Sequence, residues 1–121
     1  MKQFAVIGNP IAHSLSPILH QEVYRQLALD ASFEKIHLMP NALHSFMKVN
    51  ELDGFNVTIP YKQSVIPFLN ELDESAQTIG AVNCVHDGKG YNTDWIGFLN
   101  ALKLNNIELK EKCCTIIGAG G

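Results

Sequence analysis

Two side chains in this sequence are of the types that exchange protons with a bound small molecule. Lys62 stands two residues after Pro60, in or beside the first turn of an expected helix. Because a helix N-terminus is electropositive, it favours the neutral amine, the form that can accept a proton. A solvated surface lysine is the plainer interpretation of that position. Asp94 follows Thr93 at the expected start of another helix, where capping alone would explain it, although a capping carboxylate keeps a second oxygen for a ligand.

Two serines flank the expected start of a helix at Ser16-Pro17. If the segment is extended, the hydroxyls of Ser14 and Ser16 point the same way. They then lie beside the free backbone N–H groups of a helix N-terminus, which favour an anion. The pair could therefore bind a carboxylate without any arginine. The competing interpretation is that Ser16 only caps the helix, with Pro17 at its first position.

Three further polar side chains lie where strands are expected to begin or end. Asn56 and Thr58 share one face by strand alternation. Asn83 lies in an otherwise apolar run, so its amide requires hydrogen-bond partners. Since ligands bind at the carboxyl ends of parallel strands, these residues are candidates for a binding site.

The elements that must position these residues alternate along the chain. Short apolar runs predict strands at 4–7, 33–38, 54–57, 81–85 and 113–117. Helices are expected from residue 16, from residue 43, from about residue 61 until Pro67, between the cap Asp73 and the stop signal Gly80, and from Thr93 to Leu104. Asp87-Gly88 predicts a hairpin. This order indicates a three-layer α/β/α fold, whose mostly parallel sheet contains one antiparallel strand.

The apolar residues of the longer helices are expected to face the core. For the helix from residue 16 they are Ile18, Val23 and Leu27, and for the helix to Leu104 they are Trp95, Phe98, Leu99 and Leu102. The helix from residue 43 carries Leu43, Phe46 and Met47 on one face. Cys113 and Cys114 belong to the last expected strand, where we expect them to be buried.

The C-terminal segment resembles the beginning of a dinucleotide-binding fold. The expected strand 113–117 runs into Gly118-Ala119-Gly120-Gly121, the strand and glycine-rich turn with which a Rossmann domain opens. We therefore expect two parts, a ligand-binding domain over 1–104 and a linker with the start of an incomplete Rossmann domain over 105–121. No domain should end inside such a turn, so we expect the chain to be part of a longer protein.

Composition excludes several classes of protein. The chain has 121 residues, 46% hydrophobic and 17% charged, with a formal net charge of −3 and no basic cluster. Nucleic acid and acidic membranes are therefore unexpected partners. No apolar run approaches a membrane span, and the N-terminus does not resemble a signal peptide. Three cysteines without a C-x-x-C pattern and five scattered histidines predict neither a disulfide framework nor a metal site, which fits a reducing cytoplasm.

Several ordered motifs together resemble the shikimate dehydrogenase family. They are Gly8-Asn9-Pro10 with Ser14-Leu15-Ser16-Pro17, Asn56-Val57-Thr58-Ile59-Pro60-Tyr61-Lys62, Gly80-Ala81-Val82-Asn83, Asn92-Thr93-Asp94-Trp95-Ile96-Gly97 and Gly118-Ala119-Gly120-Gly121. The family reduces 3-dehydroshikimate to shikimate with NADPH, on the route to chorismate and the aromatic amino acids. The resemblance therefore implies a cytoplasmic NADP-dependent oxidoreductase.

The resemblance also implies a role for each candidate residue. Ser14 and Ser16 would bind the substrate carboxylate, and Lys62 would exchange the proton as a pair with Asp94. The ring hydroxyls would be bound by Asn56, Thr58, Asn83 and Asp94. The cofactor would contact Gly118, Ala119, Gly120 and Gly121, and an acidic residue at the position of Glu74 often lies near it.

Two other functions are compatible with the same residues. One is a non-catalytic module that binds shikimate or quinate, and the other is a quinate/shikimate dehydrogenase that uses NAD. Because most of the cofactor domain would follow Gly121, we expect the 121-residue chain alone not to catalyse hydride transfer. The sequence does not indicate an oligomeric state.

Overall fold

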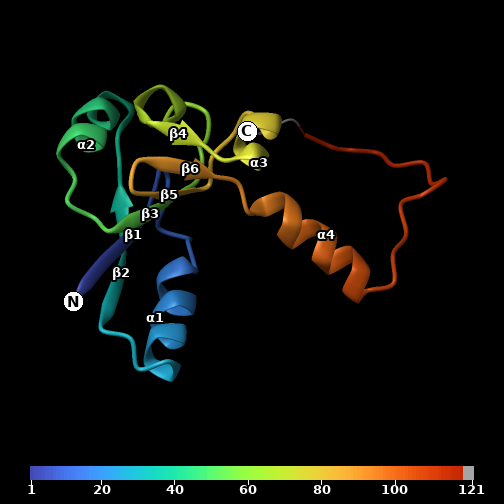
Figure 1. Ribbon diagram of the computed structural model, residues 1–121, viewed down its shortest axis with the longest axis horizontal. Helices are drawn as coiled ribbons and strands as arrows, with labels where there is room; N and C mark the ends of the chain where they lie inside the picture. Colours follow the sequence, from blue (N-terminus) through green and yellow to red (C-terminus); the bar gives the residue numbers. More distant parts are fainter. Residues whose placement is uncertain (119–121) are drawn as a thin grey trace.

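Six strands form one sheet in the order β2-β1-β3-β5-β6-β4 in the computed structural model, which describes residues 1–118 (Figure 1). The strands are β1 (Lys2–Gly8), β2 (Ala31–His37), β3 (Gly54–Val57), β4 (Glu71–Leu72), β5 (Cys84–His86) and β6 (Lys89–Tyr91). β1 pairs in parallel with β2 and β3, and β4 pairs in parallel with β6. β5 runs antiparallel to both of its neighbours, β3 and β6. The expected mostly parallel sheet with one antiparallel strand is therefore confirmed.

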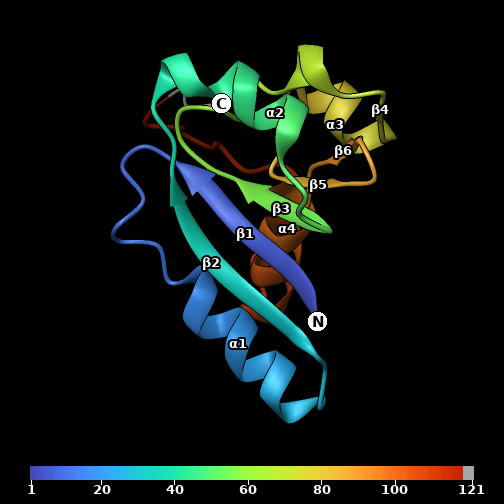
Figure 2. The same cartoon turned by 90° about the vertical axis from the view of Figure 1, so that its left-hand side faces the viewer.

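Helices α1, α2 and α3 lie on the two faces of this sheet, as expected for three layers (Figure 2). The α-helices are α1 (Ser16–Gln26), α2 (Leu43–Val49), α3 (Glu74–Ile79) and α4 (Asp94–Leu104), and the short 3₁₀ helices are η1 (Pro40–Ala42) and η2 (Ile66–Phe68). In Figure 2, α1 lies on one side of β1 and β2, whereas α2 and α3 lie on the other. A helix–sheet–helix arrangement buries both faces, which explains why β1 is a continuous apolar run.

Alternation along β1 separates two cores. Ala5 and Ile7 join the larger core on the side of α2 and α3, and Val6 joins the smaller core on the side of α1. Leu43 is buried in the larger core, and Phe46 and Met47 pack against it, as expected for α2.

The turn chemistry at two element ends is as predicted. Asp73 caps α3 by accepting a hydrogen bond from the Ala76 N–H, and Gly80 ends that helix in the left-handed conformation at φ 74°. Asp87 and Gly88, with φ of 48° and 72°, form the tight turn between β5 and β6.

The inward face of α1 was predicted wrongly. Ile18, Val23 and Leu27 are exposed. The helix contacts the sheet through the face that carries Pro17, which is buried, and His20, whose ring stacks on Phe33 with centroids 4.1 Å apart. The face with Pro17 and His20 and the face with Val23 and Leu27 both fit the spacing of a helix. Helical periodicity gives that spacing but does not say which of the two faces is buried.

The prediction that α4 turns its apolar side chains inward was also wrong. No residue of α4 is buried, and Phe98 is 63% exposed. Trp95 is also exposed, and Leu99 and Leu102 remain partly accessible. The reason is visible in Figure 1, where α4 extends away from the sheet and has no strand beneath it.

The last expected strand and the helix at residue 61 are not formed. Residues 112–118 have no regular structure, and Cys113 and Cys114 are exposed instead of buried. A strand needs a neighbouring strand for its backbone hydrogen bonds, and none of the described residues provides one for this segment. After Tyr61 the chain makes consecutive turns and then η2, so the helix expected at Lys62 is absent.

Candidate functional site

Four segments that carry candidate residues meet at one edge of the sheet. Because β1, β3 and β6 are parallel, their carboxyl ends share this edge, and the antiparallel β5 begins there. Backbone hydrogen bonds join the segments. The Asn9 N–H donates to the Ile59 carbonyl at 2.9 Å, and the Val82 N–H donates to the Lys62 carbonyl at 2.7 Å. The topology thus gathers residues that are far apart in the sequence.

Lys62 and Asp94 form an ion pair at this edge. The Lys62 Nζ donates to Asp94 Oδ2 at 2.7 Å, and the two side chains are 21% and 55% exposed. The lysine is therefore largely covered while its carboxylate partner remains accessible. A covered ammonium beside an accessible carboxylate can deliver a proton to a bound molecule at a fixed place.

Asn83 holds the start of α4 with both ends of its amide. Its Oδ1 accepts from the Thr93 N–H at 2.9 Å, and its Nδ2 donates to Thr93 Oγ1 at 2.8 Å and to Asp94 Oδ1 at 3.0 Å. The strand expected over 81–85 begins only at Cys84, so Asn83 lies just before β5, and its amide finds its partners in Thr93 and Asp94.

Asn92 is a further residue of this network that the sequence did not single out. It is 5% exposed, and its Oδ1 accepts from the Asp94 N–H at 3.0 Å. An asparagine two residues before a helix start is a known turn signal, so the Asn92-Thr93-Asp94 spacing could have indicated this bond.

The roles expected at the helix starts need correction. Asp94 does not cap α4, because it is the first helical residue, and its carboxylate contacts Lys62 and Asn83 instead. No side chain caps α1, so Ser16 is not its cap either. Instead, the Ser16 N–H donates to Ser14 Oγ at 3.3 Å. The Ser16 hydroxyl is not used in capping because Ser16 is itself the first helical residue.

Asn56 and Thr58 face the side of the sheet covered by α1. Asn56 pairs with Val6, which belongs to the core on that side, and paired residues of neighbouring strands point the same way. Thr58 follows two residues later on the same face. Its methyl group lies close to Gly8, where a Cβ would come within 2.6 Å of Thr58 Cγ2. The expected shared face is therefore present.

The sequence of this chain matches a known protein family. A sequence profile described as "Shikimate dehydrogenase substrate binding domain" matches residues 6–85. The chain belongs to this family. A curated shikimate dehydrogenase (NADP(+)) from Staphylococcus epidermidis is 45% identical over an alignment of 126 positions, which covers 98% of this chain and 47% of the relative. The chain thus spans about half the length of the curated relatives it matches.

Solved structures of shikimate dehydrogenases share the fold of this chain. Shikimate dehydrogenase 1 from Peptoclostridium difficile matches with a TM-score of 0.93 and 30% identity, over 99% of this chain and 47% of its own. The Thermus thermophilus enzyme, solved in complex with NADP(H) and shikimate, matches with a TM-score of 0.76 and 41% identity, over 91% of this chain and 44% of its own. Each likeness covers most of this chain and less than half of the solved protein.

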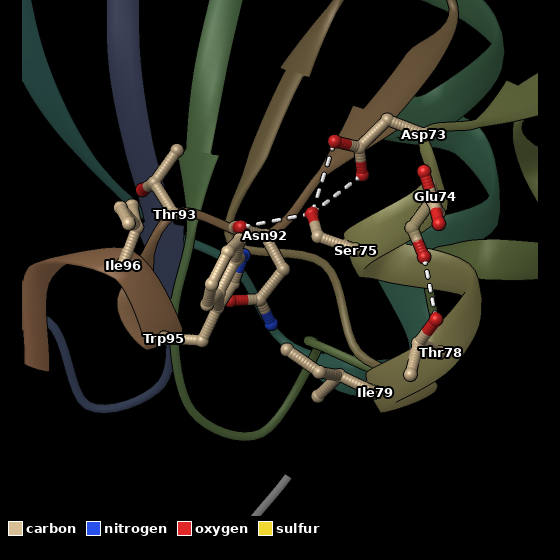
Figure 3. Close-up of a pocket in the computed structure, with 9 residues that line it drawn as sticks. All are labelled: Asp73, Glu74, Ser75, Thr78, Ile79, Asn92, Thr93, Trp95 and Ile96. Atoms are coloured by element: carbon tan, nitrogen blue, oxygen red, sulfur yellow. Dashed lines mark hydrogen bonds between the residues drawn. The ribbon is translucent and has the colours of Figure 1, made fainter. Parts of the chain in front are cut away.

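Beside the ion pair, α3 and the start of α4 line an open cavity of about 680 Å³ (Figure 3). Its lining comprises Asp73, Glu74, Ser75, Thr78, Ile79, Asn92, Thr93, Trp95 and Ile96. Hydrogen bonds, first from the Ala76 N–H, then from Ser75, lower the pKa of Asp73, although burial acts in the opposite direction. Glu74, the acidic residue that family resemblance relates to the cofactor, thus lines a space next to Thr93.

Of the four glycine-rich residues expected to contact the cofactor, the structure describes Gly118. Gly118 has φ 110°, a conformation that favours glycine, whereas Ala119, Gly120 and Gly121 lie outside the described residues. Within residues 1–118, no helix is long and apolar enough to cross a membrane.

Proposed function

We propose that the complete protein catalyses the reversible NADP-dependent reduction of 3-dehydroshikimate to shikimate, and that this chain supplies the substrate-binding half. The observation that carries the proposal is the Lys62–Asp94 ion pair at 2.7 Å, in a chain of the shikimate dehydrogenase family. A dehydrogenase of a hydroxylated acid needs one proton donor at the reacting oxygen, and this pair provides it. A cytoplasmic location and a role in aromatic amino-acid biosynthesis belong to the same proposal.

The substrate carboxylate is assigned to Ser14 and Ser16. Both side chains are partly accessible and follow β1 at the edge where the ion pair lies. The Ser16 hydroxyl does not cap α1, which leaves it available to an anion. Because hydroxyl donors at the start of a helix suit an anion, they can replace an arginine here.

The ring hydroxyls are assigned to Asn56, Thr58, Asn83 and Asp94. Amide and hydroxyl side chains can each donate and accept hydrogen bonds, whereas a carboxylate accepts two or more. A substrate that lacks one hydroxyl would leave a polar group without its partner, at a cost of about 1–3 kcal/mol. This set would therefore select polyhydroxylated rings.

The proton follows a balanced path between substrate and Lys62. When bound, NADPH supplies the hydride that the carbonyl carbon receives. The electron pair of the C=O π bond moves to the oxygen, which takes a proton from the Lys62 ammonium. In the reverse direction the neutral Lys62 amine accepts the hydroxyl proton. Asp94 holds Nζ at 2.7 Å, so the donor stays in one place through both directions.

The described residues fit the expected cofactor in two places. The positive φ of Gly118 suits a glycine-rich phosphate turn, and Glu74 lines the cavity that also contains Thr93. Gly118, together with Ala119, Gly120 and Gly121, would hold the pyrophosphate, and Glu74 would lie near the cofactor. We therefore propose the division expected from the sequence, in which residues 1–104 bind the substrate and residues 105–121 begin the NADP domain.

Enzyme assay and ligand titration test this proposal separately. The complete natural polypeptide should oxidise shikimate with NADP⁺, seen as absorbance of the reduced nicotinamide, and Asp94→Asn should lower the rate. Calorimetric titration of the 121-residue chain should give shikimate binding that Ser16→Ala weakens. Binding without turnover by the complete polypeptide would favour a non-catalytic module. Absence of both binding and turnover at millimolar shikimate would refute the assignment.

A further inference from the structure

Asn92 is the buried polar residue among residues 1–118, and its side chain bridges two segments. Its Nδ2 donates to the Ala81 carbonyl at 3.0 Å, and its Oδ1 accepts from the Asp94 N–H at the same distance. An amide buried in this way is costly unless both ends are bonded, and here both are. Within residues 1–118, the Asn92 side chain makes no hydrogen bond to the Lys62 ammonium or to the Asp94 carboxylate.

This bridge connects the backbones that carry the two members of the ion pair. Ala81 precedes Val82, whose N–H donates to the Lys62 carbonyl at 2.7 Å. The Asn92 amide therefore ties the first residue of α4 to the segment that is bonded to the backbone of Lys62. Because α4 extends away from the sheet and buries none of its own residues, its first turn is held by the hydrogen bonds of Asn83 and Asn92 and by the Lys62–Asp94 ion pair (Figure 1).

The backbone of Asn92 is anchored from the opposite side by α3. Ser75 Oγ lies 3.0 Å from the Asn92 carbonyl and 2.8 Å from Asp73 Oδ1, as Figure 3 shows. A hydroxyl has one proton, so it donates to one of these acceptors at a time. Asp73 is itself held as the cap of α3, and Asn92 thus stands between a capped helix and the start of α4.

We propose that Asn92 is a positioning residue, which places the Asp94 carboxylate beside Lys62 by holding the Asp94 backbone. The inference rests on the proposed dehydrogenase function. Asn83 has a different position in the network, because it contacts the Asp94 carboxylate directly and belongs to the proposed substrate set. In this proposal Asn92 affects the reaction by placing Asp94, so the loss caused by its removal should depend on the presence of that carboxylate.

A double-mutant cycle in the complete natural polypeptide tests this dependence. Asn92→Ala should lower kcat on the order of 10- to 100-fold, since a misplacement of about 1 Å can cost that much. In an Asp94→Asn background, the same substitution should change kcat by less than about twofold, because the carboxylate that it positions is gone. The very slow Asp94→Asn variants are measured with enzyme in excess over substrate.

Two further variants separate positioning from folding. Asn92→Ser loses the bond to Ala81 but keeps a neutral acceptor for the Asp94 N–H, so kcat should lie between those of the parent and Asn92→Ala. Asn50→Ala is the matched control: it removes an amide whose Nδ2 donates to the Phe46 carbonyl at 2.9 Å, before β3 and away from the site. It should leave kcat unchanged in both backgrounds.

The outcomes are distinct. A loss of kcat confined to the Asp94 background supports the inference, and a recovery with Asn92→Ser adds to it. If Asn92→Ala lowers kcat by the same factor with and without the Asp94 carboxylate, the inference is overturned. An unchanged kcat in both Asn92→Ala and Asn92→Ser overturns it as well. Either result leaves the proposed function in place. A parent polypeptide that does not oxidise shikimate removes the proposed function and this inference together.

Discussion

Removing the charge of Lys62 should abolish most of the enzymatic activity but reduce the free energy of unfolding only slightly. Lys62→Met preserves an unbranched apolar stem similar to the aliphatic part of lysine but deletes the ammonium that donates to Asp94 at 2.7 Å. General acid–base catalysis contributes about 10²–10⁴ in rate. At 1.36 kcal/mol for each factor of ten, the barrier should therefore rise by about 2.7–5.4 kcal/mol.

The effect on folding should be much smaller because the carboxylate of the pair is accessible to solvent. With side chains 21% and 55% exposed, the pair resembles a surface ion pair, which contributes about 0.2–1 kcal/mol to the free energy of unfolding. Loss of activity without comparable loss of stability would separate a chemical role from a structural one. Steady-state kinetics of the complete polypeptide and urea denaturation of the same variant measure the two quantities.

The chain contains a matched control for this experiment. Lys89 Nζ lies 2.6 Å from Glu71 Oε1, with side chains 32% and 62% exposed, between strands β6 and β4. Lys89→Met should lose a similarly small amount of stability and keep full activity. Equal kcat values for the two methionine variants would refute the assignment of Lys62, whatever the stability of either protein.

Three other substitutions probe the surroundings of the site. Ser16→Ala should leave stability within about 0.5 kcal/mol, since the hydroxyl is not a helix cap, and should weaken shikimate binding about tenfold; calorimetry showing unchanged affinity would exclude a role in binding. Asp73→Ala should cost about 1 kcal/mol near neutral pH through loss of the α3 cap. Hydrogen bonds, first from the Ala76 N–H, lower the folded-state pKa of Asp73. The stabilisation by the ionised carboxylate is therefore present above its ordinary pKa of 3.8 and is lost as the pH falls through the lowered pKa. The difference in urea midpoint between the parent and Asp73→Ala should narrow in acid, and a difference that stays constant contradicts this role. Gly8→Ala would bring a Cβ within 2.6 Å of Thr58 Cγ2, so we expect a loss of about 1–3 kcal/mol and a raised KM for shikimate, and an unchanged KM argues against Thr58 as a ligand.

The order and type of most elements could be read from the sequence because local signals and tertiary packing agree there. Apolar runs bounded by turn residues identified β1 and β3, and Asp73 and Gly80 marked the ends of α3. The two-residue strand β4 was missed, since its length is too short to produce a periodic pattern.

The failures occur where structure depends on what lies beneath an element. The apolar positions of α1 form two possible stripes, and the sequence does not say which one the sheet covers. For α4, an inward face presumes a surface to pack on, and the sheet does not reach this helix (Figure 1). Cys113 and Cys114 were assigned to a strand, yet a strand forms only beside a partner.

The proximity of Lys62 and Asp94 followed from family resemblance and not from either residue alone. Lys62 was expected at a helix start that the structure replaces with turns, so the helix field invoked for it has no helix to arise from. What brings the pair together is the antiparallel β5, which begins at the edge where β3 and β6 end. For Asn92, the bond to the Asp94 N–H is local and could have been read from the spacing, whereas the bond to the Ala81 carbonyl joins segments that only the folded chain brings together.

A crystal structure of the complete natural polypeptide with bound shikimate tests the central claim most directly. We predict the hydroxyl that the reaction oxidises within hydrogen-bond distance of both Lys62 Nζ and the Asp94 carboxylate, with the ligand carboxylate at Ser14 and Ser16. Shikimate bound with neither Lys62 nor Asp94 in contact with it would contradict the account.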